Sequence, residues 1–226
     1  MNIHRMRGMS GIGIICISLL CSCLGESGDM IRFSSRRAVV QETPCKSLWV
    51  RDDSIPQGYL ITSPELEQRA DLREGDCCLV EYRIDYAATL EQGAYPVELW
   101  SCDTIAKIPL VAAPADTAKM LDHEQFVSPA FGKSIFMKGR CFLQMQLDDY
   151  QPTRKDLFSF TYDPQQPVVQ AGDKRLYRLY LRSYKDQPQD TIRPSQQVVQ
   201  KALVFDRLIE EVGASEKEQG ADSVLD

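Results

Sequence analysis

The chain has 226 residues, of which 43% are hydrophobic and 26% charged, and its formal net charge at pH 7 is −6. The length and composition are typical of a globular protein with one large or two small domains. Nucleic-acid binding relies on lysine and arginine releasing counterions from phosphates, and this acidic chain has no evident basic patch. We therefore expect no nucleic-acid partner.

The chain begins with a predicted lipoprotein signal peptide, residues 1–22. Arg5 and Arg7 precede an uncharged apolar run from Met9 to Leu20, which is the arrangement of a secretory signal. As a helix this run would rise only about 18 Å, whereas crossing a bilayer takes about 20 residues. The run is therefore interpreted as a signal and not as a membrane span.

The end of this run has the pattern of a bacterial lipobox, which needs an aliphatic residue three positions before the modified cysteine and a small residue directly before it. Leu20 and Ser22 meet both requirements for Cys23, whereas Cys21 would place Leu20 in the small position. A plain secretory peptide that happens to contain cysteines is the alternative. We predict that Cys23 carries a diacylglycerol, whose two acyl chains suffice for stable anchoring. The expected location is the cell envelope, at the outer membrane, on either of its sides.

The polar composition of residues 23–37 predicts a flexible tether. A barrel domain is predicted at 38–111, because about five strand-like runs occur there without a convincing helix, as in the oligonucleotide/oligosaccharide-binding (OB) class. In the clearest run, from Cys77 to Tyr86, apolar and charged residues alternate. The Asp52-Asp53 pair is interpreted as turn chemistry and not as a calcium loop.

Residues 112–124 predict a linker, and a small antiparallel β-sandwich is expected at 125–212. Within it, residues 198–212 suit both a strand and a helix, and we favour a strand to about Phe205 followed by a short helix to Val212. The acidic segment 213–226 is predicted to be disordered. The expected fold class is all-β: an OB-like barrel, then a β-sandwich, with a short C-terminal helix.

The cysteines beyond Cys23 are expected to be buried thiols, because free cysteine behaves as a small hydrophobe, although disulfides could persist in this compartment. They are Cys45, Cys77, Cys78, Cys102 and Cys141. On a strand, Cys77 and Cys78 would point to opposite faces, and His123 is the one histidine after the signal, so no metal site is expected. His123 is interpreted as a linker residue and not as a catalytic base. No cofactor is expected.

Three runs together resemble a known family. They are Leu72–Tyr82, Phe126–Gly132 and Leu179–Tyr184, and they are similar to segments of the NigD-like lipoproteins of Bacteroidetes-type bacteria. The resemblance implies a lipobox, an N-terminal OB-type barrel and a C-terminal β-sandwich across nearly the whole mature chain, and it suggests protection of the producing cell from a bacteriocin. The chain differs from that family in its cysteine pair and its acidic tail.

No nucleophile elbow, phosphate loop or metal cluster appears in the sequence. The predicted function is therefore non-catalytic: an anchored protein whose two β modules bind a glycan, peptide or partner protein. Trp100, Tyr82 and Tyr86 are the candidate ligand contacts. Core packing is the competing role for Tyr82 and Tyr86, which share an apolar face, whereas Trp100 shares its face with Glu98.

The alternative function is an envelope glycan hydrolase that uses two carboxylates. With 32 acidic residues in the chain, some pair will always have a suitable separation, so the count does not discriminate. A buried carboxylate with a raised pKa, facing a second carboxylate, would favour the enzyme. An exposed aromatic surface would favour binding.

Overall fold

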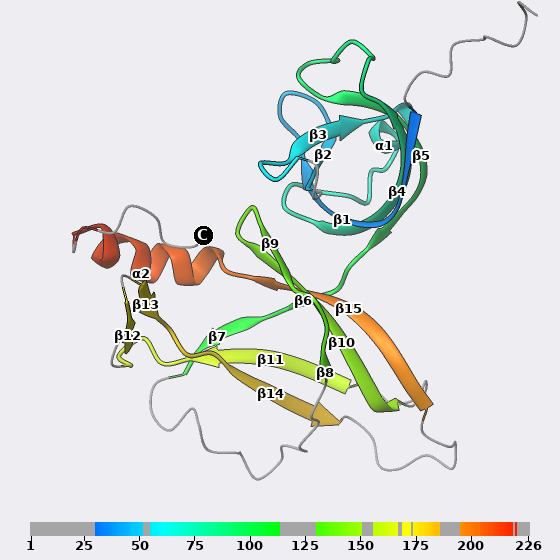
Figure 1. Cartoon of the computed structure of the whole chain (residues 1–226). Coiled ribbons are helices and arrows are strands. Elements are labelled where there is room, and N and C mark those ends of the chain that lie inside the picture. The colour runs from blue at the N-terminus through cyan, green and yellow to red at the C-terminus, as the bar shows by residue number, and fades with distance from the viewer. Residues whose placement is uncertain are drawn as a thin grey trace, which may run out of the picture.

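A computed structural model describes residues 30–51, 55–113, 130–150, 156–166, 169–172, 174–185, 195–218 and 220. Two β modules follow one another along the chain, an N-terminal closed barrel and a C-terminal pair of sheets with a helix at one end (Figure 1). The predicted all-β class, with an OB-like barrel, a sandwich and a C-terminal helix, is confirmed.

The barrel contains β1 (Met30–Gln41), β2 (Ser47–Val50), β3 (Tyr59–Thr62), β4 (Cys77–Asp85) and β5 (Tyr95–Thr104), closed in the order β1-β2-β3-β5-β4. The β3–β5 pair is parallel and the other pairs are antiparallel. The short helix α1 (Pro64–Glu67) connects β3 to β4; the Ser63 side chain caps it by accepting from the Leu66 amide. Leu66 is buried in the barrel core.

Strand β4 shows why this sequence closes into a barrel. Cys78, Val80, Tyr82 and Ile84 are each 0% exposed and share the inward face, while the polar residues between them face outward. Inward side chains from the other barrel strands complete the core, so the alternating pattern fixes the register of the strand.

Strand β1 begins at Met30, within the segment 23–37 that was predicted to be a tether, and not at Ala38. Its ladder to β4 shifts between Phe33 and Arg36, and Ser35 has a positive φ of 55°. A bulge of this kind bends a strand and interrupts the alternation of its side chains. The first half of β1 was therefore not recognisable from its pattern.

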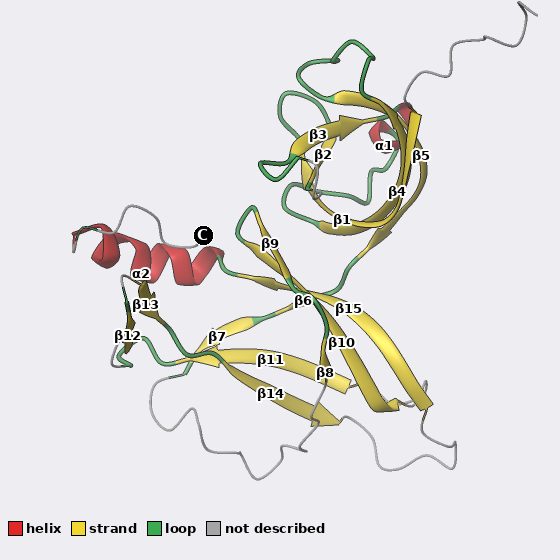
Figure 2. Cartoon of the chain, viewed as in Figure 1, coloured by secondary structure: helices red, strands yellow, loops and turns green. Residues whose placement is uncertain are grey.

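The C-terminal module has two main sheets (Figure 2). One has the order β6-β15-β10-β8, with β9 also paired to β10, and the other has the order β14-β11-β7. Leu143 and Met145 of one sheet and Phe158 and Tyr162 of the other belong to the same core. The strands are β6 (Lys107–Ile108), β7 (Leu110–Ala112), β8 (Ala130–Phe131), β9 (Ile135–Met137), β10 (Arg140–Tyr150), β11 (Asp156–Tyr162), β14 (Tyr180–Lys185) and β15 (Ser195–Val204).

A two-stranded ribbon, β12 (Val169–Ala171) and β13 (Lys174–Leu176), lies beside helix α2 (Asp206–Glu218) in Figure 1. Strand β15 followed by α2 confirms the predicted order of strand and helix. The helix ends at Glu218 and not at Val212, so part of the segment predicted to be disordered is helical. Contacts of Glu216 with the rest of the module stabilise this polar last turn.

Residues 107–112 also differ from their prediction. They were assigned mainly to the barrel, but β6 pairs in parallel with β15 and β7 pairs in parallel with β11. These edge strands carry the chain directly from the barrel into both sheets of the second module, so the barrel ends at Thr104. Their alternation alone could not show which sheet they join.

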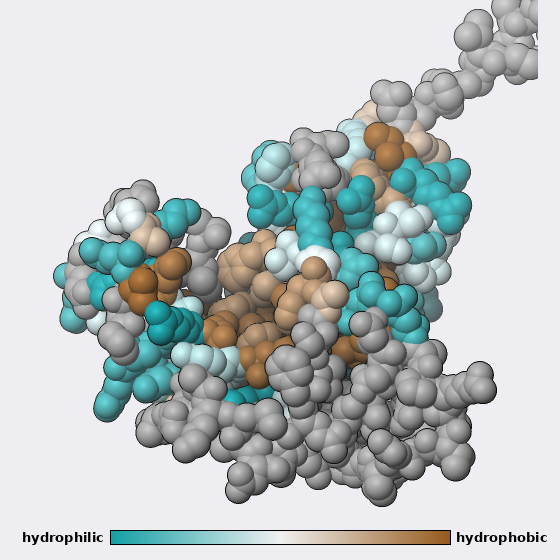
Figure 3. Space-filling view, turned by 60° about the horizontal axis from the view of Figure 1, so that its bottom comes forward, coloured by the Kyte–Doolittle hydropathy of each residue, from teal (hydrophilic) through white to brown (hydrophobic). Residues whose placement is uncertain are grey.

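The two modules pack against each other through a shared hydrophobic cluster. The barrel contributes Val39 and Cys77, and the C-terminal module contributes Met137, Phe142 and Ala202. Around this joint, the Arg140 side chain donates to the Gly75 carbonyl of the barrel and pairs with Asp206 at the start of α2. On the face turned forward in Figure 3, further hydrophobic residues gather between the barrel and α2. The modules therefore form one body.

Candidate functional site

Trp100 lies on the outer face of β5 and is 42% exposed, as its shared face with Glu98 predicted. Its indole Nε1 donates to Glu98 Oε1 at 2.9 Å, and the Arg32 guanidinium carbon lies 4.3 Å from the ring centroid. Arg83 on β4 forms an ion pair with Glu98 at 2.7 Å. We call Arg32, Glu81, Arg83, Glu98 and Trp100 the Trp100 surface.

Strand register explains how these residues meet. Arg32 pairs with Arg83 across β1 and β4, and Arg83 pairs with Glu98 across β4 and β5, so the three side chains form a row on one face. Arg32 also lies 3.7 Å from Glu81. The sequence pointed to Trp100 through Glu98, but it could not show Arg32, which is distant in the chain.

The Trp100 surface carries charges of both signs, joined in the pairs Arg32–Glu81 and Arg83–Glu98. The Trp100 N–H and the neighbouring Arg83 hold the pKa of Glu98 below its usual range, so this group is a carboxylate at neutral pH. An aromatic ring flanked by charged donors and acceptors can bind a polar ligand that has one apolar face. Arg32 covers one side of the ring, and Trp100 is still 42% exposed and accessible for such a contact.

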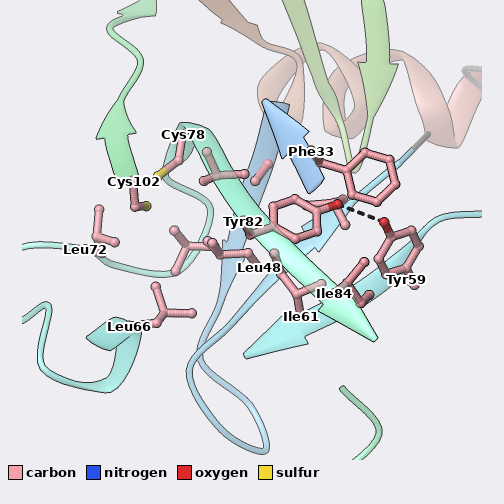
Figure 4. Close-up of a cluster of buried hydrophobic side chains, with 14 residues drawn as sticks. Phe33, Leu48, Tyr59, Ile61, Leu66, Leu72, Cys78, Tyr82, Ile84 and Cys102 are labelled. Carbon is pink, nitrogen blue, oxygen red and sulfur yellow. Dashed lines mark hydrogen bonds between the residues drawn. The ribbon is translucent and has the colours of Figure 1, made fainter. Parts of the chain in front are cut away.

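Tyr82 cannot contact a ligand in this structure, which corrects its prediction as a site residue. Its side chain faces the barrel interior, is 0% exposed, and its hydroxyl lies 2.8 Å from the Tyr59 hydroxyl (Figure 4). Tyr86 is half-buried and donates to the same Tyr59 hydroxyl at 3.1 Å. Its ring makes edge-to-face contacts with Tyr59 and Tyr95. Tyr82 is therefore a core residue, and Tyr86 packs mainly against the core, as the competing interpretation expected.

The face of β2 and β3, where OB barrels bind ligands, is partly covered in this protein. Trp49 on β2 packs against the joint between the modules, and Lys138 from the β9–β10 turn lies 5.3 Å from its ring centroid. No local sequence pattern indicated this contact, because the two residues lie in different modules. The Trp100 surface, on β1, β4 and β5, is the more accessible aromatic site.

All five cysteines of the described part are free thiols. Cys77, Cys78 and Cys102 are buried, as expected, and Cys45 and Cys141 are half-buried. Cys78 and Cys102 are adjacent in the barrel core (Figure 4), and the hydrogen bond from Cys78 to Cys102, together with burial, raises the pKa of Cys78. Within the described ranges, no group of three potential metal ligands comes together.

Among the described residues, no buried carboxyl group has a pKa that is raised in the way that would favour a hydrolase. Among the described acidic groups with a shifted pKa, the shift is downward in each case: Asp71, Asp76, Glu98 and Glu211. The hydrogen bond from Arg69 lowers the pKa of Asp71 to about 2. The buried carboxylate of Glu216 pairs with Arg175 at 3.3 Å and accepts from the Tyr177 hydroxyl. These contacts serve to dock α2, and they supply no observation in favour of catalysis.

Several predictions fall on residues outside the described ranges. They concern the signal peptide, Cys23, the Asp52-Asp53 turn and most of the linker with His123. Among the described helices, none combines the length and apolar character needed to cross a membrane.

No protein-family model matches the chain, and no curated protein is similar to it in sequence. Its fold is similar to that of an uncharacterized protein from Parabacteroides merdae, with a TM-score of 0.63, 20% identity and 84% of each chain covered. A protein of unknown function, DUF1344, from Bacteroides vulgatus has a TM-score of 0.54 and 13% identity, covering 78% of this chain and 77% of its own.

A third solved structure, described as a "Putative lipoprotein" from Bacteroides fragilis, has a TM-score of 0.53 and 12% identity, with 82% of each chain covered. At these identities the similarity shows the fold alone. None of these three structures bears the name NigD-like, so membership of that family stays a prediction. The three neighbours share this fold over most of their length.

Proposed function

We propose that this protein is a lipid-anchored, non-catalytic protein of the bacterial cell envelope that binds a glycan, peptide or protein partner through its β modules. The observation that carries the anchoring is the position of the lipobox. Cys23 precedes Met30, the first residue of the barrel, by seven positions. A lipid at Cys23 would hold a folded module close to the membrane.

The proposed location is the outer membrane. The lipobox, the resemblance to NigD-like lipoproteins and the fold shared with a protein described as a "Putative lipoprotein" all support an anchored envelope protein. The bacteriocin-protection role rests on the family resemblance alone, and no contact in the described residues adds to it.

The Trp100 surface is the proposed contact with the ligand. Its exposed indole can pack on the apolar side of a sugar ring or an aliphatic side chain, while Arg83 and Glu98 offer a donor and an acceptor at its edge. The ion pair with Glu98 fixes the orientation of these groups before binding, which reduces the entropy lost when a ligand is ordered.

Metabolic labelling with a fatty acid and mass spectrometry of the mature N-terminus test the anchor. Cys23→Ala should abolish both the label and the cleavage before residue 23, whereas the matched variant Cys21→Ala should retain both. Normal lipidation of the Cys23→Ala protein would contradict the proposal.

Binding is tested with the intact anchored protein on arrays of envelope glycans and by crosslinking to neighbouring proteins in cells. A partner found in this way should be lost in Trp100→Ala and retained in Val198→Ala, which changes an exposed apolar residue of the other module. A ligand that both variants retain would show that the Trp100 surface is not the contact.

A further inference from the structure

We infer that the end of the barrel where β1 begins is a membrane-contacting surface, formed by Met30, Ile31 and Leu90, which inserts into the bilayer that holds the lipid of Cys23. The inference rests on the proposed anchor and adds to it the orientation of the folded protein. Its partner is the lipid surface itself.

The length of chain between the anchor and the barrel limits where the barrel can lie. Cys23 and Met30 are seven positions apart, and a fully extended chain spans at most about 3.6 Å per residue. Whatever its conformation, this segment therefore keeps the start of β1 within about 25 Å of the modified cysteine. The end of the barrel at Met30 is the part of the molecule that the anchor brings nearest to the lipid.

This same end exposes apolar side chains. Met30 is 54% exposed, Ile31 43% and Leu90 48%. Met30 pairs with Asp85, the last residue of β4, and Leu90 lies in the loop that follows. The start of β1 and the β4–β5 loop are at the same end of the barrel in Figure 1, and Figure 3 shows hydrophobic residues beside the start of the described chain.

Two tyrosines lie at the same end of the barrel strands. Tyr86 directly follows β4 and Tyr95 begins β5; both are half-buried, and their ring centroids are 5.5 Å apart. Tyrosine is enriched at membrane interfaces, because its ring is apolar and its hydroxyl is polar. Packed tyrosines and a few exposed apolar side chains at one end of the barrel suit shallow insertion at the level of the lipid headgroups.

The rest of the molecule is consistent with this orientation. The C-terminal module packs on Val39 and Cys77, at the opposite end of β1 and β4 from Met30 and Asp85, and in Figure 1 it lies away from the start of β1. Glu91 directly follows Leu90 and Asp85 pairs with Met30, so the contact does not depend on attraction to anionic lipid. It should therefore persist in zwitterionic bilayers and at high salt.

The two native tryptophans provide a test. Arg32, two residues after Met30, covers Trp100, whereas Trp49 pairs with Val39, nine residues after Met30. A strand rises about 3.3 Å per residue. Val39, the neighbour of Trp49, is therefore up to about 30 Å along β1 from Met30, whereas Arg32, the neighbour of Trp100, is only about 7 Å from it. Lipidated protein would be placed in phosphatidylcholine vesicles that contain a headgroup-nitroxide lipid. Trp100 in the Trp49→Phe variant should be quenched several-fold more strongly than Trp49 in the Trp100→Phe variant.

Replacing the three apolar residues, as Met30→Ser, Ile31→Ser and Leu90→Ser together, should reduce the quenching of Trp100. The matched triple variant with Val111→Ser, Leu176→Ser and Val198→Ser changes equally exposed residues of the C-terminal module and should not reduce it. Equal quenching of both tryptophans, or no effect of the first triple variant, would overturn the inference. A third outcome would also overturn it. If the unchanged protein were a dimer and the first triple variant a monomer with the same quenching, the surface would bind a second copy and not the membrane.

The same samples separate this inference from the proposed function. Mass spectrometry of the lipid on Cys23 and sedimentation with the vesicles report on the anchor. If the lipid is absent, the proposed anchoring fails. If the lipid is present and the two tryptophans are quenched equally, the anchor stands and only the orientation is overturned.

Discussion

Gly58 and Trp49 illustrate how single residues set the surface of this barrel. Gly58 has a φ of +78° and lies directly against the Trp49 indole, in the connection that leads from β2 to β3. A side chain on Gly58 would occupy the place of the ring, which packs in turn against the joint between the modules. One glycine therefore makes room for an aromatic residue that is partly covered by the second module.

Gly58→Ala should destabilise the protein by more than the backbone strain alone. The added Cβ would lie 2.1 Å from Trp49 Cζ2, and overpacking of this kind costs about 1–3 kcal/mol beyond the cost of a left-handed backbone, about 1–2 kcal/mol. Gly93→Ala is the matched control, because Gly93 also has a positive φ, +87°, but no atom within 4 Å of the added Cβ. Equal midpoints of denaturant unfolding for the two variants would contradict this explanation.

At the scale of elements, α2 shows how side-chain contacts can stabilise a polar helix. The Tyr162 hydroxyl on β11 donates to Glu211, and the Tyr177 hydroxyl, just after β13, donates to Glu216. Glu216 is 4% exposed and also pairs with Arg175 on β13. These contacts dock the helix on both the main sheet and the ribbon, and they explain why it continues beyond Val212.

Glu216→Gln should therefore lower the free energy of unfolding by about 1–3 kcal/mol, the cost of leaving a buried polar partner unsatisfied. Glu210→Gln, at an exposed position of the same helix, should change it by no more than about 0.5 kcal/mol. Chemical denaturation followed by circular dichroism would measure both. A Glu216→Gln protein as stable as the Glu210→Gln protein would show that the contacts of Glu216 do not hold the helix.

The docking of α2 also predicts a dependence on alkaline pH. Burial, together with the bonds to Glu211 and Glu216, raises the pKa of Tyr162 and of Tyr177 to about 12. In the unfolded chain tyrosine has a pKa of about 10, so this stabilisation is fully present below pH of about 10 and is lost as the pH rises towards about 12. Tyr162→Phe combined with Tyr177→Phe should flatten the fall in unfolding free energy over this interval. Parallel pH profiles of the unchanged protein and the double variant would contradict the role of these two tyrosines.

At the scale of the whole molecule, the joint converts two modules into one body. Its core includes side chains of β1 and β4 from the barrel and of β9, β10 and β15 from the second module. Arg140 adds polar contacts to Gly75 on one side and Asp206 on the other. Because the same cluster stabilises both modules, the two should unfold together.

Phe142→Ala tests this coupling. Phe142 is 1% exposed on β10, and truncating a buried phenylalanine costs about 3–5 kcal/mol. Trp100 lies on β5 of the barrel, away from the joint cluster that Trp49 contacts, so the fluorescence of Trp100 in a Trp49→Phe background reports on barrel unfolding. The midpoint of this fluorescence transition should shift to a lower denaturant concentration in Phe142→Ala and stay unchanged in Val198→Ala. A barrel transition unaffected by Phe142→Ala would mean that the modules unfold independently.

Much of this architecture could be predicted from local patterns. Alternation in Cys77–Tyr86 located β4 and its buried face. The pattern of residues 198–212 suited both a strand and a helix, and the family resemblance, with the need of the sandwich for an edge strand, led to the correct order of strand and helix. The exposure of Trp100 followed from its neighbour Glu98. Local patterns failed where the chain is irregular or short, at the bulge in β1 and at the edge strands β6 and β7.

The amino-acid sequence by itself determined the predicted lipobox, the all-β class and the side of β5 that carries Trp100, because each depends on residues close together in the chain. Only the tertiary structure decided that Arg32 covers Trp100, that Lys138 covers Trp49 and that Tyr82 is buried against Tyr59. These contacts join residues far apart in sequence, and their pairing depends on how the strands close and how the modules pack. The alternation of a strand defines its two faces, but it does not show what covers each one.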